Sequence, residues 1–110
     1  MDRAVVERVL RLVGLGARSR GIVIGVEQVR EAAKKDKVVY VLVAHDAARN
    51  SIEKLVPLLS ARGVKFVAGP SSAELGAAVG KEQTAAVGIV DRQLARGIRA
   101  LVDSSSEGTP

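Results

Sequence analysis

The residues best suited to chemistry in this chain surround Gly25, which separates a short apolar piece from a segment crowded with both charge signs. A helix that begins there leaves its first backbone N–H groups, those of Val26, Glu27 and Gln28, without acceptors. Together with the positive end of the helix dipole, such N–H groups form a ready site for a phosphate. Because glycine has no side chain, a bulky partner can also approach the backbone closely.

Charged side chains on the predicted helix would meet the same partner. Helical spacing places four of them on one exposed face, where a nucleic-acid backbone could contact them together: Glu27, Arg30, Glu31 and Lys34. Four further cations frame the segment, and we expect them at the same end of the fold as the helix start: Arg18, Arg20, Lys35 and Lys37. The simpler alternative is a solvated amphipathic helix with an ordinary glycine start, and this stretch by itself favours that alternative.

The charge of the whole chain indicates the class of partner. Lys and Arg number 17 against 12 acidic residues, which gives a net charge of +5 over 110 residues. A chain this basic attracts polyanions, of which we expect nucleic acid, although charge that merely keeps a protein soluble explains the composition equally well. Tyr40 and Phe66 are the only aromatic residues, and both lie in apolar, strand-like runs. We therefore do not expect bases to stack on aromatic rings.

Patterns typical of enzymes are incomplete in this chain. Gly16 and Gly21 have the spacing of a phosphate loop, but apolar residues stand where a Lys and a Ser or Thr must contact phosphate and magnesium. The chain has no cysteine and a single histidine, His45, so it offers neither a thiolate metal site nor a histidine cluster. No nucleophile elbow is present. We expect a protein that is not an enzyme and uses no metal or other cofactor.

One domain accounts for this length. We expect it over residues 1–102, followed by a disordered tail over residues 103–110, because DSSSEGTP offers almost nothing to bury. No stretch is apolar over the length of a membrane span, and the charged first helix does not read as a secretory signal. The cytoplasm is the expected compartment.

Helical spacing of apolar residues predicts helices, and short apolar runs between them predict strands. The alternation of the two predicts an α/β sandwich with helices on both faces of one sheet. The expected order is a helix over 4–13 ended by Gly14 and Gly16, a strand at 22–24, a helix from Gly25 to about Lys35, a strand over 38–44, a helix that Pro57 kinks or restarts and Gly63 ends, a strand over 64–69, a short helix ending at Gly80, a strand over 84–90 and a terminal helix capped by Asp91.

Local signals refine these elements. The continuous apolar run VVYVLVA, residues 38–44, is typical of a strand covered on both faces, so it should be the central strand. After it, His45, Asp46 and Asn50 supply turn and cap chemistry for the next helix. A Ser-rich start followed by Glu74 predicts a capping box for the short helix.

The segment AHDAARNSIEKLVPLLSARGVKFVAGPSSAELGAAVG, residues 44–80, resembles the ribosomal protein L7Ae/L30e family of kink-turn RNA-binding proteins. The matching features are an A-x-D-A turn after a strand, a proline before paired leucines at residues 57–59, and the pattern P-S-x-x-E-L-G-x-A-x-G over residues 70–80. The front segment LVGLGARSRGIVIGVEQV resembles the bacterial members. The resemblance covers nearly the whole chain except the tail.

This resemblance implies a single-domain, three-layer α/β/α sandwich with a small mixed sheet of about four strands, which grips a sharply bent RNA internal loop. In the family, the second helix enters the groove at tandem sheared G·A pairs, and the loop before the last strand packs against an extruded base. That loop corresponds here to Gly80, Lys81, Glu82, Gln83 and Thr84, with Val79 just before it. It lacks the apolar residue that is common after the glycine.

The helix motif departs from the family pattern, which is Gly-Thr-Asn-Glu followed three residues later by Lys. The positions here read Gly25, Val26, Glu27, Gln28 and Glu31. Gln28 keeps a hydrogen-bonding tip, but Glu27 replaces an amide or basic residue and Glu31 reverses the charge of the lysine. A carboxylate repels phosphate, although it can accept a hydrogen bond from a base amino group.

Arg30 or Lys34 could compensate for these carboxylates from a neighbouring turn. We therefore predict a protein that binds structured RNA, either rRNA or another kink-turn RNA, with the ribosome as a candidate partner. Neither membrane association nor DNA specificity is expected. The alternative is a protein–protein interaction module on the same fold that has lost specific kink-turn binding, in which Glu27 and Glu31 contact a basic partner.

Overall fold

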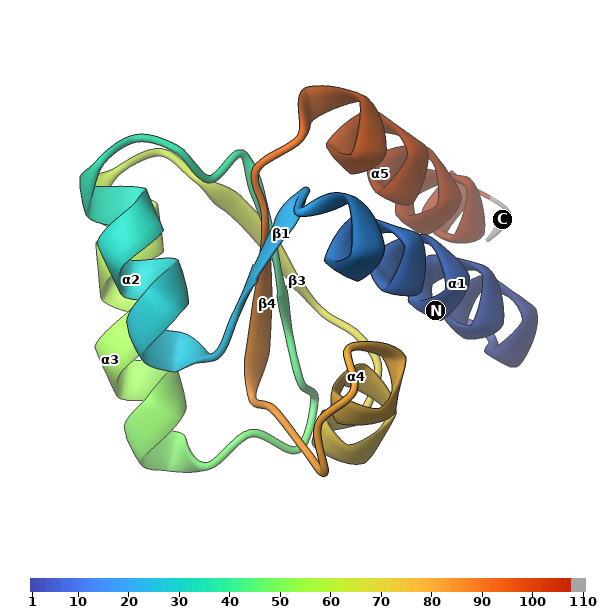
Figure 1. Cartoon of the computed structure of the whole chain (residues 1–110), viewed down its shortest axis with the longest axis horizontal. Helices are drawn as coiled ribbons and strands as arrows, with labels where there is room; N and C mark the ends of the chain where they lie inside the picture. The colour runs from blue at the N-terminus through green and yellow to red at the C-terminus, as the bar shows by residue number, and fades with distance from the viewer. Residues whose placement is uncertain (108–110) are drawn as a thin grey trace.

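Helices and strands alternate along the chain in the computed structural model, which describes residues 1–107, with side chains to residue 104 (Figure 1). The elements are α1 (Arg3–Ser19), β1 (Ile22–Ile24), α2 (Val26–Lys34), β2 (Tyr40–Val43), α3 (Arg49–Ala61), β3 (Lys65–Ala68), α4 (Ser72–Ala78), β4 (Ala86–Ile89) and α5 (Arg92–Glu107).

The four strands form one mixed sheet in the order β1-β4-β2-β3. Strand β4 pairs antiparallel with β1 and β2, whereas β2 pairs parallel with the edge strand β3. One end of the sheet, called here the Ile89 end, has Ile22 and Tyr40 paired with Ile89. At the other, the Ala86 end, Val43 pairs with Ala86. Strand β2 is interior, as predicted, and shares that position with β4.

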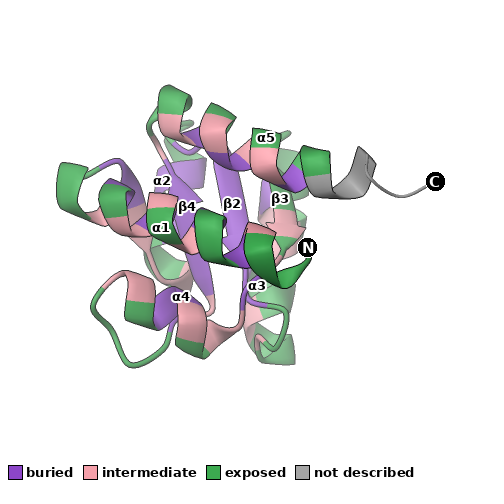
Figure 2. Ribbon diagram, turned by 90° about the vertical axis from the view of Figure 1, so that its right-hand side faces the viewer, coloured by how far each residue is buried: buried purple, intermediate pink, exposed green. Residues whose placement is uncertain are grey.

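Helices α1, α4 and α5 cover one face of the sheet, and α2 and α3 cover the other (Figure 1). Alternate residues of β2 serve the two faces: Leu42 packs with α1, α4 and α5, and Val41 packs with α2 and α3. Figure 2 shows buried residues running through β2 and β4 between the helices. Each fully buried Leu or Val contributes about 1.5–3 kcal/mol of transfer free energy. The predicted three-layer α/β/α sandwich with a four-stranded mixed sheet is confirmed.

Helix α1 does not end at Gly14 and Gly16, contrary to the sequence prediction; it continues to Ser19. A Cβ atom at Gly16 would lie 2.5 Å from a methyl carbon of Leu94 and 2.8 Å from one of Ile22. The glycine therefore serves close packing of α1 against α5 and β1. The helix ends at Arg20, whose left-handed φ of 61° stops propagation.

The last helix also extends beyond its predicted end. The sequence placed the boundary between domain and tail after residue 102, but α5 continues to Glu107. Burial of Val102 against the core anchors this part of the helix, and no glycine or proline follows until Gly108. Residues 108–110 of the predicted tail lie outside the described residues.

Two details of α3 differ from what the sequence allowed. Of the two effects expected of Pro57, the restart is wrong, because the helix runs continuously from Arg49 to Ala61. The proline lies on the exposed side, where water can satisfy the carbonyl that loses its N–H partner. The N-cap of α3 is Ala48, without a side-chain hydrogen bond. Asp46, expected to cap α3, instead accepts a hydrogen bond from the Ser72 N–H at 2.8 Å and so serves the start of α4.

The capping box at α4 is confirmed. The Ser71 hydroxyl accepts from the Glu74 N–H at 3.1 Å, and the Glu74 carboxylate accepts from the Ser71 N–H at 3.0 Å. Glu74 also forms an ion pair with Arg3, which links α4 to the first turn of α1. The hydrogen bond from Ser71, followed by the Arg3 contact, lowers the pKa of Glu74.

Protonation of Glu74 should weaken this link. Because the pKa of Glu74 is lowered in the folded protein, its carboxylate stabilises the fold at neutral pH, and this contribution disappears as pH falls below about 4.3. The variant Glu74→Gln keeps an oxygen for the Ser71 N–H but cannot titrate. Its unfolding temperature should fall less than that of the wild type between pH 5 and pH 3. Glu53→Gln, on exposed α3, is the control, and parallel curves for wild type and Glu74→Gln would contradict the assignment.

Candidate nucleic-acid interface

Helix α2 begins at the Ala86 end without a side-chain cap from the described residues. Its N-cap, Gly25, has φ 94° and ψ 155°, a backbone conformation that strains any residue with a side chain. The Gly25 N–H donates to the Ala86 carbonyl at 2.9 Å. A Cβ atom at Gly25 would meet no atom within 4 Å. The first turn of α2 therefore opens onto free space with no side-chain acceptor for its N–H groups.

Two other helices begin at the same end of the sheet. Helix α3 begins after Ala48, also without a side-chain cap, and α4 begins after Ser71 with its capping box. Figure 1 shows the three starts together at the lower end of the molecule. Each helix start carries a partial positive charge of up to about half an elementary charge. At α4 the carboxylates of Asp46 and Glu74 already accept the N–H groups, so the starts of α2 and α3 supply the positive backbone field at the Ala86 end.

The loop between α4 and β4 adjoins these helix starts. It folds back over α4, because the Lys81 N–H donates to the Gly76 carbonyl at 2.8 Å and the Thr84 N–H donates to the Ser72 carbonyl at 3.0 Å. A Cβ atom at Gly76 would lie 2.4 Å from the Gln83 Cα atom, so only a glycine lets the loop lie this close. The exposed tip of the loop consists of residues 80–83.

A single carbonyl group joins the loop to the start of α2. The Ala86 carbonyl accepts the Gly25 N–H at 2.9 Å and the buried Thr84 hydroxyl at 3.2 Å. The end of the loop and the N-cap of α2 are therefore fixed to the same atom of β4. This arrangement brings together the two segments that the sequence analysis assigned to RNA, residues 25–28 and residues 79–83.

A hollow of about 400 Å³ lies beside this joint. Asp46 is at its wall, and the hydrogen bond from the Ser72 N–H is the main cause that lowers the pKa of its carboxyl group. The remaining wall consists of main-chain and small polar groups from three segments. The lining residues are Asp46, Ala47, Ala48, Ser51, Ser72, Gln83, Thr84 and Ala85.

The carboxylates on α2 have nearby cations. Glu27 lies 4.0 Å from Arg30 and 4.0 Å from Lys54, and Glu31 lies 3.7 Å from Lys34. Arg30 also donates to the Lys54 carbonyl, which holds its side chain against α3. Exposed pairs of this kind contribute about 0–1 kcal/mol and are easily exchanged. The face is therefore close to charge balance, and its cations are already engaged.

Comparison with known proteins identifies the family. The family model described as "Ribosomal protein L7Ae/L30e/S12e/Gadd45 family" matches residues 7–98. This chain belongs to that family. The comparison with curated protein sequences gave no match.

Solved structures agree with the assignment to the L7Ae/L30e/S12e/Gadd45 family. A protein of unknown function from Bacillus halodurans superposes with a TM-score of 0.81 at 30% identity, covering 86% of this chain and 96% of that one. The Giardia lamblia 15.5kD RNA binding protein superposes with a TM-score of 0.77 at 24% identity, covering 94% of this chain and 89% of that one. Both the resemblance found in the sequence and the fold it implied are confirmed.

Four cations that the sequence placed at the same end of the fold as the start of α2 lie at the opposite end of the sheet in this family member. The short apolar piece after Arg20 is strand β1, which carries the chain about 10 Å from one end of the sheet to the other before Gly25. The Val90 N–H donates to the Gly21 carbonyl at 2.9 Å, which places this turn at the Ile89 end. The end of α2 lies at that end too. The cations displaced from the helix start are Arg18, Arg20, Lys35 and Lys37.

Sequence reasoning missed the groups that shape the site of this family member. Asp46 was assigned to the wrong helix because its partner, Ser72, is 26 residues away in the sequence. Gly76 was not recognised as the contact point of the loop, and no local pattern reveals the Ala86 carbonyl. The A-x-D-A turn is the signal that could have indicated the role of Asp46, and the glycine after Leu75 is the signal that could have indicated the role of Gly76.

Within residues 1–107, no helix combines the length and apolar character needed to cross a bilayer. Among residues 1–104, whose side chains the structure describes, no three His, Cys, Asp or Glu side chains come close enough to hold a metal ion.

Gly76→Ala should displace the loop and weaken nucleic-acid binding together. The added methyl group meets backbone atoms of Gln83, which cannot rotate away, so we expect a loss of about 1–3 kcal/mol of stability. Gly97→Ala is the matched control in another helix, because its nearest neighbour, a Leu12 methyl carbon, lies at an ordinary 3.4 Å. Urea unfolding and RNA titration measure both effects. Equal behaviour of the two variants would show that the loop does not depend on Gly76.

Proposed function

We propose that this protein is a non-enzymatic RNA-binding protein that recognises structured, kink-turn-like RNA with the Ala86 end of its sheet. The observation that carries the proposal is the open, uncapped start of α2 beside the loop at residues 79–83, both held by one carbonyl. Membership of the family and the similarity to an RNA-binding protein from Giardia lamblia support RNA as the partner. We further propose rRNA or another kink-turn RNA as the target, in the cytoplasm and in association with the ribosome, with no DNA specificity and no membrane attachment.

The proposed contact uses main-chain and amide groups first. The N–H groups of residues 26–28 donate to phosphate oxygens, and the helix dipole favours the charge. The exposed Gln28 side chain reaches a base edge, and Glu27 accepts from a base amino group. Because Arg30 and Lys54 flank Glu27, they reduce its repulsion of the backbone. The loop at residues 79–83 then closes on the other side of the bend.

A titration against two RNAs tests this function. One is a kink-turn RNA, and the other is a copy whose G·A pairs are replaced by Watson–Crick pairs, both near physiological salt. We expect clear preference for the kinked RNA. Equal affinity for both would reduce the protein to a general polyanion binder, and lack of binding to either would contradict RNA binding.

Gly25→Ala should lower that preference roughly tenfold. The backbone at the start of α2 must shift because alanine is strained at a positive φ, and the N–H groups of residues 26–28 then no longer point at the phosphate. Gly63→Ala is the matched control. Both glycines have a left-handed φ and open space around a Cβ atom, but Gly63 follows α3 at the Ile89 end. The control should lose similar stability and keep the preference, as measured by unfolding and by the same titration. Loss of preference in both variants would contradict the placement of the site.

A protein–protein interaction module is the second candidate. It is favoured by the exposure of the Glu27 and Glu31 side chains, 73% and 60%, on the face that would otherwise meet phosphate. Under this candidate the two carboxylates contact a basic partner, and neither RNA in the titration binds.

Glu31→Lys separates the two candidates. If RNA meets this face, replacing an acid by a base should strengthen binding of the kinked RNA roughly tenfold and steepen its salt dependence. Glu7→Lys makes the same change of charge on α1, at a side chain as exposed as that of Glu31, and controls for net charge. Equal gains for both variants, or no gain for Glu31→Lys, would mean that the phosphate backbone does not pass over Glu31.

A further inference from the structure

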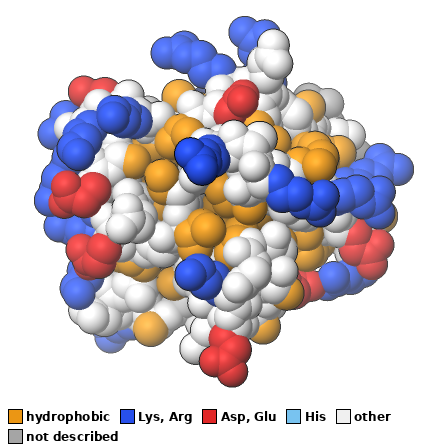
Figure 3. All heavy atoms as spheres, viewed as in Figure 1, with side chains coloured by type: hydrophobic (Ala, Val, Ile, Leu, Met, Phe, Trp, Pro, Cys, Tyr) orange, Lys and Arg blue, Asp and Glu red, His pale blue; other side chains and the backbone are white. Residues whose placement is uncertain are grey.

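The cations of this protein are distributed unequally between paired and unpaired side chains. Among the described residues, most of those on α2 and α3 lie within 4.0 Å of a carboxylate: Arg30, Lys34, Arg49, Lys54 and Arg62. A second group, without such a partner among the described side chains, lies at the Ile89 end and along α5: Arg18, Arg20, Lys35, Lys37, Lys65, Arg92, Arg96 and Arg99. Arg8 and Arg11 of α1 and Lys81 of the loop before β4 are also unpaired among these side chains but lie outside this group. Figure 3 shows Lys and Arg side chains along the edge of the molecule where α2 ends and α5 begins.

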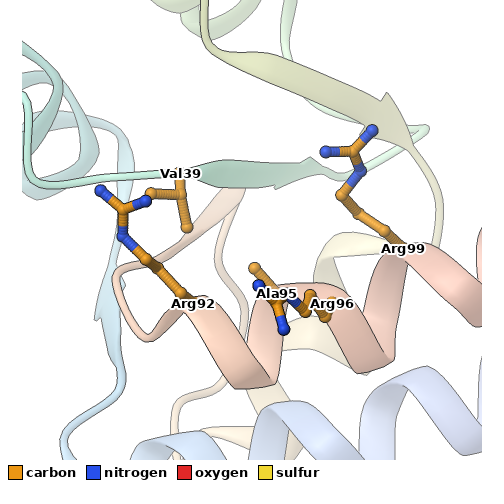
Figure 4. A pocket seen from close by; sticks show the side chains of 5 residues that line it. All are labelled: Val39, Arg92, Ala95, Arg96 and Arg99. Atoms are coloured by element: carbon orange, nitrogen blue, oxygen red, sulfur yellow. The ribbon is translucent and has the colours of Figure 1, made fainter.

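Three arginines of α5 form the centre of this second group. Arg92, Arg96 and Arg99 follow one another at spacings of four and three residues, which places them on one side of the helix. They line a hollow of about 180 Å³ together with Val39 and Ala95. Figure 4 shows the Arg92 and Arg99 side chains leaving α5 toward the strand that follows Val39.

Neighbouring groups do not neutralise this stripe. The Asp91 carboxylate accepts the Leu94 N–H at 3.0 Å and is occupied as the helix cap. Asp103, one turn beyond Arg99, forms no ion pair with it within 4.0 Å. Like charges three or four residues apart destabilise a helix by about 0.2–0.5 kcal/mol per pair. Arg92 and Arg96 therefore repel each other in the free protein, and a bound polyanion would relieve that repulsion.

We propose that the α5 stripe, Arg92, Arg96 and Arg99, is a second contact surface for the phosphate backbone of an RNA duplex, separate from the Ala86 end. The choice of RNA among polyanions rests on the proposed function. Guanidinium groups match phosphate oxygens in pairs and keep their charge at any physiological pH. Arg92 and Arg99 are seven residues apart, about 10 Å along the helix, so the members of the stripe can meet successive phosphates.

This surface reads the backbone and not the bases. Arg99 lies over the Tyr40 ring, 5.7 Å from its centre, and Tyr40 is only 5% exposed, so no base can stack on it. The strands of the sheet hold this surface and the start of α2 at opposite ends. When a bent RNA is bound at the Ala86 end, the Ile89 end therefore stays accessible to a second, straight RNA segment.

A plain RNA duplex without an internal loop is the probe for this contact. The double variant Arg92→Gln with Arg96→Gln should bind it roughly tenfold more weakly near physiological salt and reduce the slope of log affinity against log salt by about 2. Adding Arg99→Gln should reduce the slope by about 1 more. Because Arg99 covers Tyr40, thermal unfolding checks the triple variant, and the double variant carries the test if the triple variant does not fold.

Arg8→Gln with Arg11→Gln is the matched control. These two exposed arginines of α1 also lack ion pairs among the described side chains, and their loss changes the net charge equally. The control should lose much less affinity than the α5 double variant. Equal losses, or an α5 variant that binds the duplex like the wild type, would overturn the proposal.

The same assay distinguishes this surface from the proposed function. Gly25→Ala should lower the preference for kinked RNA, whereas the α5 double variant should lower the affinity for the plain duplex and keep that preference. Preference for kinked RNA without any effect of the α5 variants would overturn the second surface and leave the proposed function standing. Duplex binding that depends on α5, without preference for kinked RNA, would support the second surface and overturn kink-turn recognition.

Discussion

The candidate site depends on the carbonyl group of Ala86, which accepts hydrogen bonds from the Gly25 N–H and the Thr84 hydroxyl. Through this atom, strand β4 positions the start of α2 and the end of the loop before it. Both donors are in the buried or half-buried part of the structure, where an unpaired carbonyl would be costly. The requirement to satisfy one acceptor therefore aligns two segments that are about sixty residues apart in the sequence.

The direction of the strands divides the charges between the two ends of the molecule. Because β1 enters the sheet at Ile22 and leaves it at Ile24, the turn after α1 lies at one end of the sheet and α2 begins at the other. Three helix starts and the carboxylates of Asp46 and Glu74 meet at the Ala86 end, whereas Arg18, Arg20, Lys35 and Lys37 lie at the Ile89 end. The net charge of the chain is thus concentrated away from the helix starts.

Much of the fold follows from local patterns in the sequence. The apolar run at residues 38–44 identified an interior strand, and the Ser-rich start with Glu74 identified the cap of α4. What failed was information that exists only between elements. Gly16 was interpreted as a helix end, but it is required for packing, because Leu94, far along the chain, lies where a side chain at this position would be. Asp46 caps a helix 26 residues away. The cations before β1 were misplaced because a three-residue strand is too short to show its span as a pattern.

The open start of α2 also has a consequence for divergence among related chains. Its geometry is fixed by main-chain atoms, the φ of Gly25 and the bond to β4, and the exposed side chains at Glu27 and Gln28 take no part in it. Substitutions at these two positions leave the backbone scaffold intact and change only its chemistry. Selection can therefore alter what the helix start recognises, one codon at a time, without first having to rebuild the fold.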